Sequence, residues 1–384
     1  MHFAGVLLLS TVALFWVVYG LRVARGTLEL PRLDEYAPAP DASCPAISLV
    51  FAARDEEEKL PLALGTLNEI DYPRLEIVAV NDRSSDATAQ ILRDTARRDD
   101  RLRLVNVESL PPAWLGKPHA LQEGYTASHG EWLLFTDADV RFRPDALRRA
   151  MAIANARKLD HLTLMGDVEM HGFWEKTVLT FFGLGFYLAT NPHAVSDLES
   201  RNYLGIGAFQ LVRRSAYEAS GTHRRLSMEV LDDMKLGKIV KRAGFRSEAG
   251  MAGDYVSVRW HAGVGNIVRG VTKNFFANAE FSVGRVALQL AGVFCTSVLP
   301  FAALWFAHGW MLAAALVSVM VAVGFHAGTA SVMRASPVYA LTHPIGAVIF
   351  GYMLVRSTVV TLRQGGVVWR DTFYPLDELR RGLV

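Results

Sequence analysis

Four long runs without a charged residue constrain this chain most, because such runs fit a lipid bilayer better than a globular interior. One run occupies residues 3–21, and the others occupy residues 286–307, 310–333 and about 337–355. A helix of about 20 apolar residues, rising about 1.5 Å per residue, crosses the hydrocarbon core of a bilayer. We therefore predict one N-terminal and about three C-terminal transmembrane helices.

The N-terminal run is predicted to be a retained anchor and not a cleaved signal peptide. It lacks a basic segment before it and a small-x-small cleavage site after it. Arg22 and Arg25 follow the run directly and, by the positive-inside rule, place the next domain in the cytoplasm. The C-terminal tail carries four more arginines: Arg363, Arg370, Arg380 and Arg381. Since four crossings would put that tail outside, one C-terminal segment is expected to be re-entrant or interfacial.

Between the outer runs, short apolar stretches alternate with helical patterns, which is typical of β-α-β units around a mostly parallel sheet. The stretches at residues 46–53, 76–80, 102–105 and 132–136 are the predicted strands. The resulting division is an anchor (1–25), a proline-rich linker (26–45), a cytoplasmic α/β domain (46–265), an interfacial helix (266–285), a transmembrane region (286–362) and a tail (363–384).

Composition excludes several classes of function. The formal net charge of +2 gives no reason to expect a nucleic-acid partner. The two cysteines, Cys44 and Cys295, are too few for a disulfide framework or a zinc-binding pattern.

Polar side chains follow three predicted strands directly, at Arg54, Asp82 and Asp137. Because the carboxyl ends of parallel strands share one edge of a sheet, these residues should converge on one crevice. Asp137 and Asp139 form an Asp-Ala-Asp triplet whose oxygen ligands suit Mg²⁺ or Mn²⁺ held against substrate phosphates. The alternatives are ordinary: a solvated loop before the next helix for the triplet, and a turn or helix cap for Asp82.

Four segments together resemble family 2 glycosyltransferases, which have the GT-A fold, a Rossmann-like and mostly parallel sheet. These are SLVFAARDE at 48–56, VNDRSSD at 80–86, FTDAD at 135–139 and LDDMKLG at 231–237. PPAWLGK at 111–117 looks like the Trp-x-Gly-Lys element of lipid-directed members, such as ceramide glucosyltransferase and the bacterial hopanoid- and carotenoid-associated enzymes. The resemblance covers roughly residues 46–285.

The resemblance implies a role for each matching residue. Ala53 and Glu56, next to Arg54, would line the nucleoside pocket, and Asp82 would contact the base. Lys117 would reach the diphosphate or the sugar, while Asp137 and Asp139 would hold the metal on the diphosphate. The set of donor-binding residues is thus Ala53, Arg54, Glu56, Asp82, Lys117 and Asp137, with Arg269 and Lys273 added below.

The acidic pair Asp232-Asp233 stands where the family usually has Glu-Asp before a helix. By that resemblance Asp233 is the general base that takes the acceptor's proton, and Asp232 is a shorter stand-in for the glutamate. An in-line displacement of this kind inverts the anomeric centre. The alternative is that both acids only favour the helix N-terminus through its dipole.

Two stretches compete for the family's late Gln/Arg-x-x-Arg-Trp motif. Arg259-Trp260 contains the dipeptide, but it comes too early and alternates like a strand. Spacing favours Arg269, with Lys273 as its helper near the diphosphate, although an interfacial arginine that meets lipid phosphates is an equal alternative. The aromatic stretch 173–188 is either core or a membrane-surface element that guides a lipid acceptor, and we favour the second.

The sequence thus predicts a metal-dependent, inverting sugar transfer to a hydroxyl of a lipid acceptor. The expected donor is a uridine diphosphate sugar, and the expected place is the cytoplasmic face of a bacterial inner membrane. Two alternatives are a processive polysaccharide synthase and an inactive scaffold that binds nucleotide sugars. The first should carry the intact Gln-x-x-Arg-Trp motif, which is not evident, and the joint presence of Asp137, Asp139 and Asp233 argues against the second.

Overall fold

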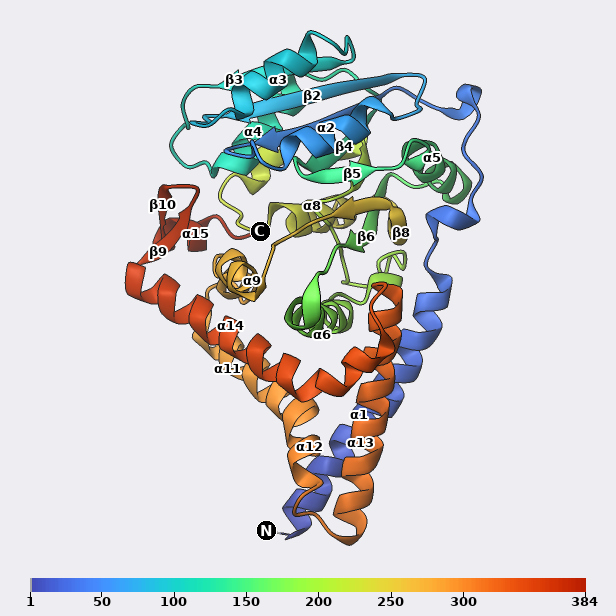
Figure 1. Cartoon of the computed structure of the whole chain (residues 1–384), viewed down its shortest axis with the longest axis vertical. Helices are drawn as coiled ribbons and strands as arrows, with labels where there is room; N and C mark the ends of the chain where they lie inside the picture. The colour runs from blue at the N-terminus through green and yellow to red at the C-terminus, as the bar shows by residue number, and fades with distance from the viewer. Residues whose placement is uncertain (1) are drawn as a thin grey trace. The chain divides into compact units, whose positions relative to one another are not determined.

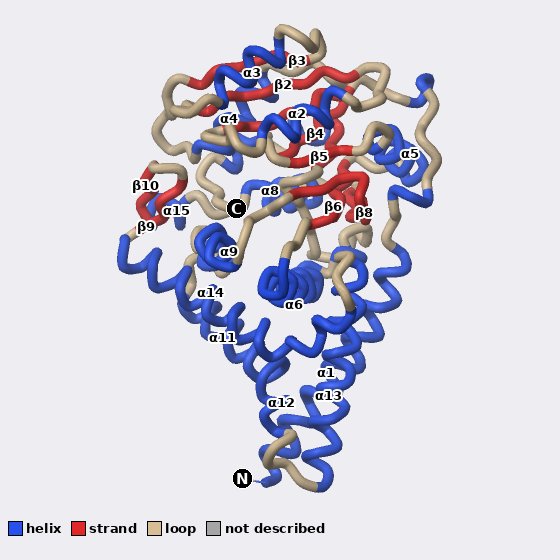
Figure 2. Tube along the Cα trace, in the orientation of Figure 1, coloured by secondary structure: helices blue, strands red, loops and turns tan. Residues whose placement is uncertain are grey.

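The computed structural model describes residues 2–384, and the chain divides into two compact units. The sheet unit comprises residues 30–169, 192–260 and 368–384, and the apolar-helix unit comprises residues 2–29, 170–191 and 261–367. Nearly all strands belong to the sheet unit (Figure 2). The aromatic segment 170–191, which interrupts the sheet unit in sequence, clusters with the apolar helices.

An eight-stranded mixed sheet organises the sheet unit, with strand order β3-β2-β1-β4-β7-β6-β8-β5. The four strands β1 to β4 are mutually parallel where they pair, whereas β7 runs antiparallel to both of its neighbours. The predicted mostly parallel α/β fold is therefore confirmed. The strand bounds are β1 (Ile47–Ala53), β2 (Leu75–Asp82), β3 (Leu102–Val107), β4 (Trp132–Asp137), β5 (Val140–Phe142), β6 (His161–Val168), β7 (Gln210–Arg213) and β8 (Ser247–Val258).

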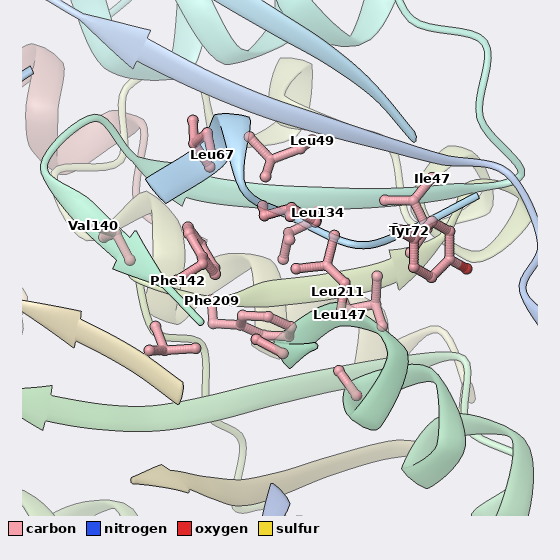
Figure 3. Packing of buried hydrophobic residues seen from close by; sticks show 14 of the residues in the cluster. Ile47, Leu49, Leu67, Tyr72, Leu134, Val140, Phe142, Leu147, Phe209 and Leu211 are labelled. Atoms are coloured by element: carbon pink, nitrogen blue, oxygen red, sulfur yellow. The ribbon is translucent and has the colours of Figure 1, made fainter. Parts of the chain in front are cut away.

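Helices cover both faces of this sheet, which is why β1 and β2 are apolar almost throughout. Leu49 points to the face packed by α2 and α5, while Val50 points to the face packed by α4, α7 and α8. Figure 3 shows the first of these cores, where Leu49, Leu67, Leu134 and Leu147 lie together. The helix bounds are α2 (Leu60–Asn68), α3 (Thr88–Ala96), α4 (Gly116–Thr126), α5 (Ala146–Arg157), α7 (Arg214–Ala219) and α8 (Asp232–Arg242).

The strand register aligns the carboxyl ends of the parallel strands. Ala53 of β1 lies opposite Asn81 of β2, and Ala52 lies opposite Asp137 of β4. The loops that leave β1, β2 and β4 therefore start from one edge of the sheet, and every polar residue predicted to follow a strand is carried on that edge.

Four helices of the apolar-helix unit are long and apolar enough to cross a membrane: Phe3–Glu29, Val283–Ala303, Gly309–Val332 and Pro337–Gln364. This confirms the predicted count of one N-terminal and three C-terminal apolar helices. Within the unit, α1 lies beside α13, and α14 contacts α6, α10 and α11 (Figure 1). The bounds are α1 (His2–Glu29), α6 (Gly172–Thr190), α9 (Val264–Val271), α10 (Asn274–Asn278), α11 (Val283–Val293), α12 (Leu299–Ala303), α13 (Gly309–Val332) and α14 (His343–Gln364).

The connectivity limits how many of these helices cross. The chain leaves the sheet unit after Trp260 and rejoins it at Val368. A compact water-facing unit is expected on one side of a membrane, so we expect the segment between these residues to cross an even number of times. Of its three apolar helices, we expect α14 to suit a crossing least, because the charged residue Arg356 lies in its interior.

We therefore expect the tail and the sheet unit to face the same compartment, and the turn between α12 and α13 to face the other. Single cysteines introduced as Arg98→Cys, Asp377→Cys and His308→Cys report these three places, all of which are exposed. In sealed vesicles of one orientation, an impermeant maleimide should react with the cysteines at 98 and 377 to the same extent. The cysteine at 308 should react where these two are protected, and be protected where they react. The parent chain corrects for Cys44 and Cys295, and opposite labelling of residues 98 and 377 would contradict the topology.

Candidate active site

Two lysines hold the two carboxylates of the Asp-Ala-Asp triplet at the end of β4. The Lys117 ammonium, on the first turn of α4, lies 2.6 Å from Asp137 Oδ1. The Lys59 ammonium, just before α2, lies 2.7 Å from Asp139 Oδ2. The triplet is thus a paired-charge site formed by β4, α2 and α4, and not an isolated solvated loop.

Asp233 joins this site because glycine lies between it and Asp137. The Gly207 N–H donates to Asp233 Oδ2 at 3.0 Å, and the Met234 N–H donates to Asp233 Oδ1 at 2.7 Å. A Cβ added to Gly207 would lie 2.6 Å from Asp137 Oδ2 and 3.1 Å from Asp233 Oδ2. The structure therefore brings the predicted metal ligand and the predicted base together next to one glycine.

The neighbouring glycines explain how α8 approaches so closely. A Cβ on Gly205 would lie 1.9 Å from the Asp233 carbonyl oxygen, and one on Gly237 would lie 2.0 Å from the Leu204 carbonyl oxygen. Contacts this short exclude any side chain, so the segment 204–207 packs backbone to backbone against α8. The Gly-rich segment thus places the N-terminus of α8 at the end of β4.

Charge at the site is mutually compensating. Burial opposes the charged form of Lys117, but the carboxylates of Asp137, Asp232 and Asp233 outweigh it and raise the pKa of this lysine. Burial, reinforced by the nearby Asp137 carboxylate, raises the pKa of Asp139 despite its pairing with Lys59. Three acids therefore act on one ammonium group, and this excess of negative charge is suited to binding a further cation.

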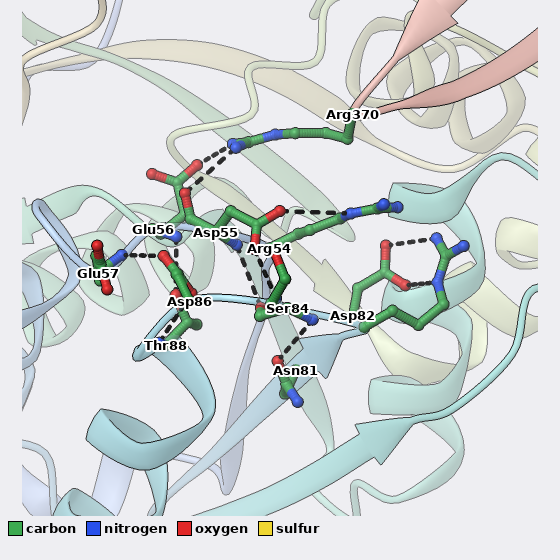
Figure 4. A network of polar contacts seen from close by, with 12 residues as sticks. Arg54, Asp55, Glu56, Glu57, Asn81, Asp82, Ser84, Asp86, Thr88 and Arg370 are labelled. Carbon is green, nitrogen blue, oxygen red and sulfur yellow. Dashed lines mark hydrogen bonds and ion pairs between the residues drawn. The ribbon is translucent and has the colours of Figure 1, made fainter.

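The loops that follow β1 and β2 are tied together by hydrogen bonds (Figure 4). The Glu57 N–H donates to Asp86 Oδ2 at 3.1 Å, and the Ala87 N–H donates back to Glu57 Oε2 at 2.9 Å. Asp55 and Arg83 adopt φ values of 51° and 55°, which non-glycine residues rarely hold unless the surroundings fix them. The polar edge beside β1 and β2 is thus a preformed double loop.

Asp82 is buried beneath this double loop, and its carboxylate is paired with the Arg83 guanidinium at 2.7 Å. The capping role that we weighed for Asp82 falls to Asp86, whose Oδ1 accepts the Thr88 N–H at 2.9 Å. A Cβ on Gly116 would lie 2.7 Å from Asp82 Oδ2. Asp82 therefore faces the N-terminal turn of α4, which also carries Lys117.

The remaining predicted donor residues are divided between the two units. Ala53 is fully buried at the end of β1, and Arg54 lies beside Asp55, with their charged groups 3.8 Å apart. Arg269 of α9 and Lys273, directly before α10, belong to the apolar-helix unit, where Arg269 donates to Asn266 at 2.6 Å. The part of these two basic residues in the site stays a prediction.

The competing Arg259-Trp260 dipeptide belongs to the sheet unit, directly after β8. Arg259 donates to the Glu169 carbonyl oxygen at 2.7 Å, and the Trp260 carbonyl oxygen lies 3.5 Å from the Lys59 ammonium. Since Lys59 also binds Asp139, the backbone of Trp260 lies next to the triplet.

Three residues at this edge were not predicted from the sequence to belong to the site. Lys59 had a local signal, because a single lysine ends the acidic run 55–58 after the first strand. Arg370 and Tyr374 had none, because they come from the C-terminal tail and reach Glu56 and Gly116 only in the folded chain.

The chain matches the family model "Glycosyltransferase like family 2" over residues 45–258, more than half of its length. It is 25% identical, over 61% of its length, to 4,4'-diaponeurosporenoate glycosyltransferase of Staphylococcus haemolyticus, of which 62% is covered. It is 24% identical, over 53% of its length, to beta-monoglucosyldiacylglycerol synthase of Trichormus variabilis, of which 43% is covered. The match thus spans less than two thirds of the length of either relative.

Among solved structures, the mannosyltransferase PcManGT of Pyrobaculum calidifontis, in complex with GDP-Man and Mn²⁺, is similar over 93% of this chain and 99% of its own. The TM-score is 0.54 at 18% identity. This likeness concerns the fold alone, and it agrees with the GT-A fold expected from the sequence.

Replacing Gly207 tests whether the closeness of Asp137 and Asp233 matters. Gly207→Ala puts a methyl group against both carboxylates, so we expect sugar transfer to slow by about tenfold or more, equivalent to about 1.4 kcal/mol of lost transition-state stabilisation. Gly65→Ala is the matched control, because no atom lies within 4 Å of the added Cβ in α2. Circular dichroism should show both variants folded, and an unchanged rate for Gly207→Ala would contradict the assignment of this site.

Proposed function

This chain belongs to glycosyltransferase-like family 2, and we propose that it transfers a sugar from a nucleotide-sugar donor to a hydroxyl group of a lipid acceptor at a membrane. The observation that carries the proposal is that the Asp137 and Asp233 carboxylates both lie close to Gly207. One carboxylate is placed for the leaving diphosphate and the other for the incoming hydroxyl, and a single displacement needs both at once.

In this mechanism Asp233 is the general base. Its two oxygens each accept a backbone N–H, from Gly207 and Met234, which fixes the plane of the carboxylate before an acceptor arrives. Asp233 takes the proton of the acceptor hydroxyl while the oxygen of that hydroxyl attacks the anomeric carbon. The bond from this carbon to the diphosphate oxygen breaks in the same step. Attack opposite the leaving group inverts the anomeric centre. Lys117 places a positive charge beside the departing diphosphate.

The residues present fit a divalent cation. Asp137 and Asp139 offer oxygen ligands two positions apart, although no group of three potential ligands of the His, Cys, Asp or Glu type occurs among residues 2–384. Two carboxylates leave most of a coordination shell for substrate phosphates, so the cation would be shared with the donor. Bound there, Mg²⁺ or Mn²⁺ would neutralise charge that develops on the nucleoside diphosphate.

The donor proposed is a uridine diphosphate sugar held along the preformed double loop. Arg54 and Glu56 follow the buried Ala53 in the loop that leaves β1, and Asp82 ends the neighbouring strand β2, where we propose that it contacts the base or the ribose. Hydrogen bonds between the loops fix these groups without a ligand, so little conformational entropy is lost on binding.

A lipid acceptor is supported by the apolar-helix unit. Its helix α6 begins with Phe173 and Trp174, whose exposed fractions are 51% and 55%. Exposed aromatic residues at a helix end are typical of a membrane surface. The names of the two relatives above refer to a diaponeurosporenoate and a diacylglycerol. We place the enzyme in a bacterial inner membrane, with the sheet unit in the cytoplasm.

Purified protein mixed with a panel of uridine and guanosine diphosphate sugars and a bacterial lipid extract should give a glycosylated lipid, detected by mass spectrometry. Asp233→Asn should reduce transfer by about 10²-fold or more, within the range that general-base catalysis supplies, while nucleotide binding persists. The matched control is Asp254→Asn, which removes an acid from the ion pair of β8 with Arg143. A long polymer as product would identify a processive synthase, and full activity of Asp233→Asn would refute the base assignment.

Metal binding has a readout apart from catalysis. In the presence of uridine diphosphate, the wild-type protein should bind Mn²⁺, detected as the loss of the free-ion signal in electron paramagnetic resonance. Asp139→Asn should weaken this binding by about tenfold, equivalent to about 1.4 kcal/mol, because one anionic ligand is lost. Asp145→Asn, which alters an acid paired with Arg149 at the start of α5, should bind like the wild type. Equal binding by Asp139→Asn would remove this residue from the metal site.

A further inference from the structure

The last residues of the chain fold back as a small structure of their own within the sheet unit. Strands β9 (Gly366–Trp369) and β10 (Thr372–Pro375) form a hairpin, and helix α15 (Leu376–Arg381) follows it. The two residues of the hairpin turn, Arg370 and Asp371, have φ values of 48° and 63°. A two-residue turn with both φ values positive is tight and matches the twist of its strands, so Arg370 is held at a defined tip.

Arg370 reaches the loop that leaves β1. Its guanidinium forms an ion pair with the Glu56 carboxylate, and its Nη1 donates to the Asp55 carbonyl oxygen at 3.4 Å (Figure 4). The Glu56 side chain is only 16% exposed. Burial raises the pKa of Glu56, and the guanidinium works against this by favouring the charged form. A mostly buried carboxylate at the proposed nucleoside pocket thus has its cationic partner in the tail.

Tyr374 reaches a second wall of the same site. Its side chain is buried, and its hydroxyl oxygen accepts the Gly116 N–H at 3.3 Å. Gly116 begins α4, where backbone N–H groups have no partner within the helix. The next residue is Lys117, and the Gly116 Cα faces Asp82. Tyr374 therefore fixes the turn that carries one donor-binding residue and packs against another.

The far end of the tail is anchored as well. The Lys235 ammonium donates to the carboxyl-terminal residue Val384 at 2.7 Å, and the Val384 N–H donates to Glu229 at 3.1 Å. Leu379 of α15 is fully buried. Since Lys235 lies on α8, two residues after Asp233, the tail contacts the β1 loop, α4 and α8. These are the three elements that carry the proposed nucleoside pocket, Lys117 and the base.

We propose that the C-terminal hairpin is a wall of the donor site, and that Arg370 and Tyr374 are positioning residues for the nucleoside diphosphate moiety of the donor. Arg370 acts through Glu56, and Tyr374 acts through Gly116. This inference rests on the proposed function, because it needs a donor at the edge beside β1 and β2. Both residues act on donor binding in the ground state and the transition state alike, so their loss should raise KM for the donor more than it lowers kcat.

Steady-state kinetics with varied donor concentration test this directly. Arg370→Ala should raise the donor KM by about tenfold with kcat changed less than about threefold, and the dissociation constant of uridine diphosphate, from calorimetry, should rise in parallel. Arg370→Lys keeps the charge but loses the planar fork, so it should recover part of the loss. Tyr374→Phe keeps the ring and removes the acceptor of the Gly116 N–H, and it should raise the donor KM by a smaller factor.

A double-mutant cycle separates action through Glu56 from general damage. If Arg370 acts through Glu56, then Arg370→Ala and Glu56→Gln together should raise the donor KM no more than the larger single change, whereas independent roles would multiply. Arg380→Ala is the matched control, since Arg380 lies in the same tail and is 3.8 Å from Asp377 on the surface of α15. It should leave both constants unchanged.

The outcomes distinguish this inference from the proposed function. If the wild-type chain transfers sugar and Arg370→Ala keeps the wild-type donor KM, the positioning role is wrong and the proposed function stands. A lower thermal stability of Arg370→Ala with an unchanged KM would show that the hairpin is only structural. If the wild-type chain neither binds nucleoside diphosphates nor transfers sugar, both proposals fail.

Discussion

The absence of side chains at Gly205 and Gly207 is the constraint on which the rest of the site depends. These positions let the backbone of residues 204–207 lie against α8, so that Asp233 comes up to Asp137 at the end of β4. Asp137 and Asp233 are 96 positions apart, and neither needs the other for its local structure. The missing Cβ atoms of Gly205 and Gly207 let β4 and α8 approach closely enough for their carboxylates to lie next to one glycine. Larger residues there would separate the two charges that a single displacement reaction needs together.

Closeness of this kind has an electrostatic cost, and the lysines offset it. Asp137, Asp232 and Asp233 would repel one another in a partly buried site, but Lys117 lies among them and its pKa is raised by all three. The Lys59 ammonium likewise offsets the charge of Asp139, with which it forms an ion pair. Both ammonium groups are on flexible stems, so each can turn toward phosphate oxygens without a movement of the backbone, which would leave the carboxylates free to hold a divalent cation. The resting ion pairs are thus compatible with a site that binds its metal and its donor together.

How much of this was readable from the sequence depends on how local each signal is. Apolar strands followed at once by Arg54, Asp82 or Asp137 predict both the sheet and the convergence at its edge, because register follows from parallel pairing. Asp233 was identified through the resemblance of its motif, but its contact with Gly207 was not, since a Gly-x-Gly segment has many uses. Arg370 was read only as a charge that favours the cytoplasm. Its pairing with Glu56 joins residues 314 positions apart, and no local pattern indicates such a contact.

The same tail connects the chain's topology with its chemistry. A segment that leaves the sheet unit after Trp260 and re-enters at Val368 has to return to the side from which it left. Three full crossings in between would carry Arg370 and Tyr374 to the wrong compartment, where they could contact neither Glu56 nor Gly116. From the contacts of the tail we therefore expect one of the three C-terminal apolar helices not to cross, and Arg356 in the interior of α14 favours that helix. If the segment between Trp260 and Val368 crossed the membrane an odd number of times, the sheet unit could still fold around its own core. The hairpin would then be absent from the proposed donor site.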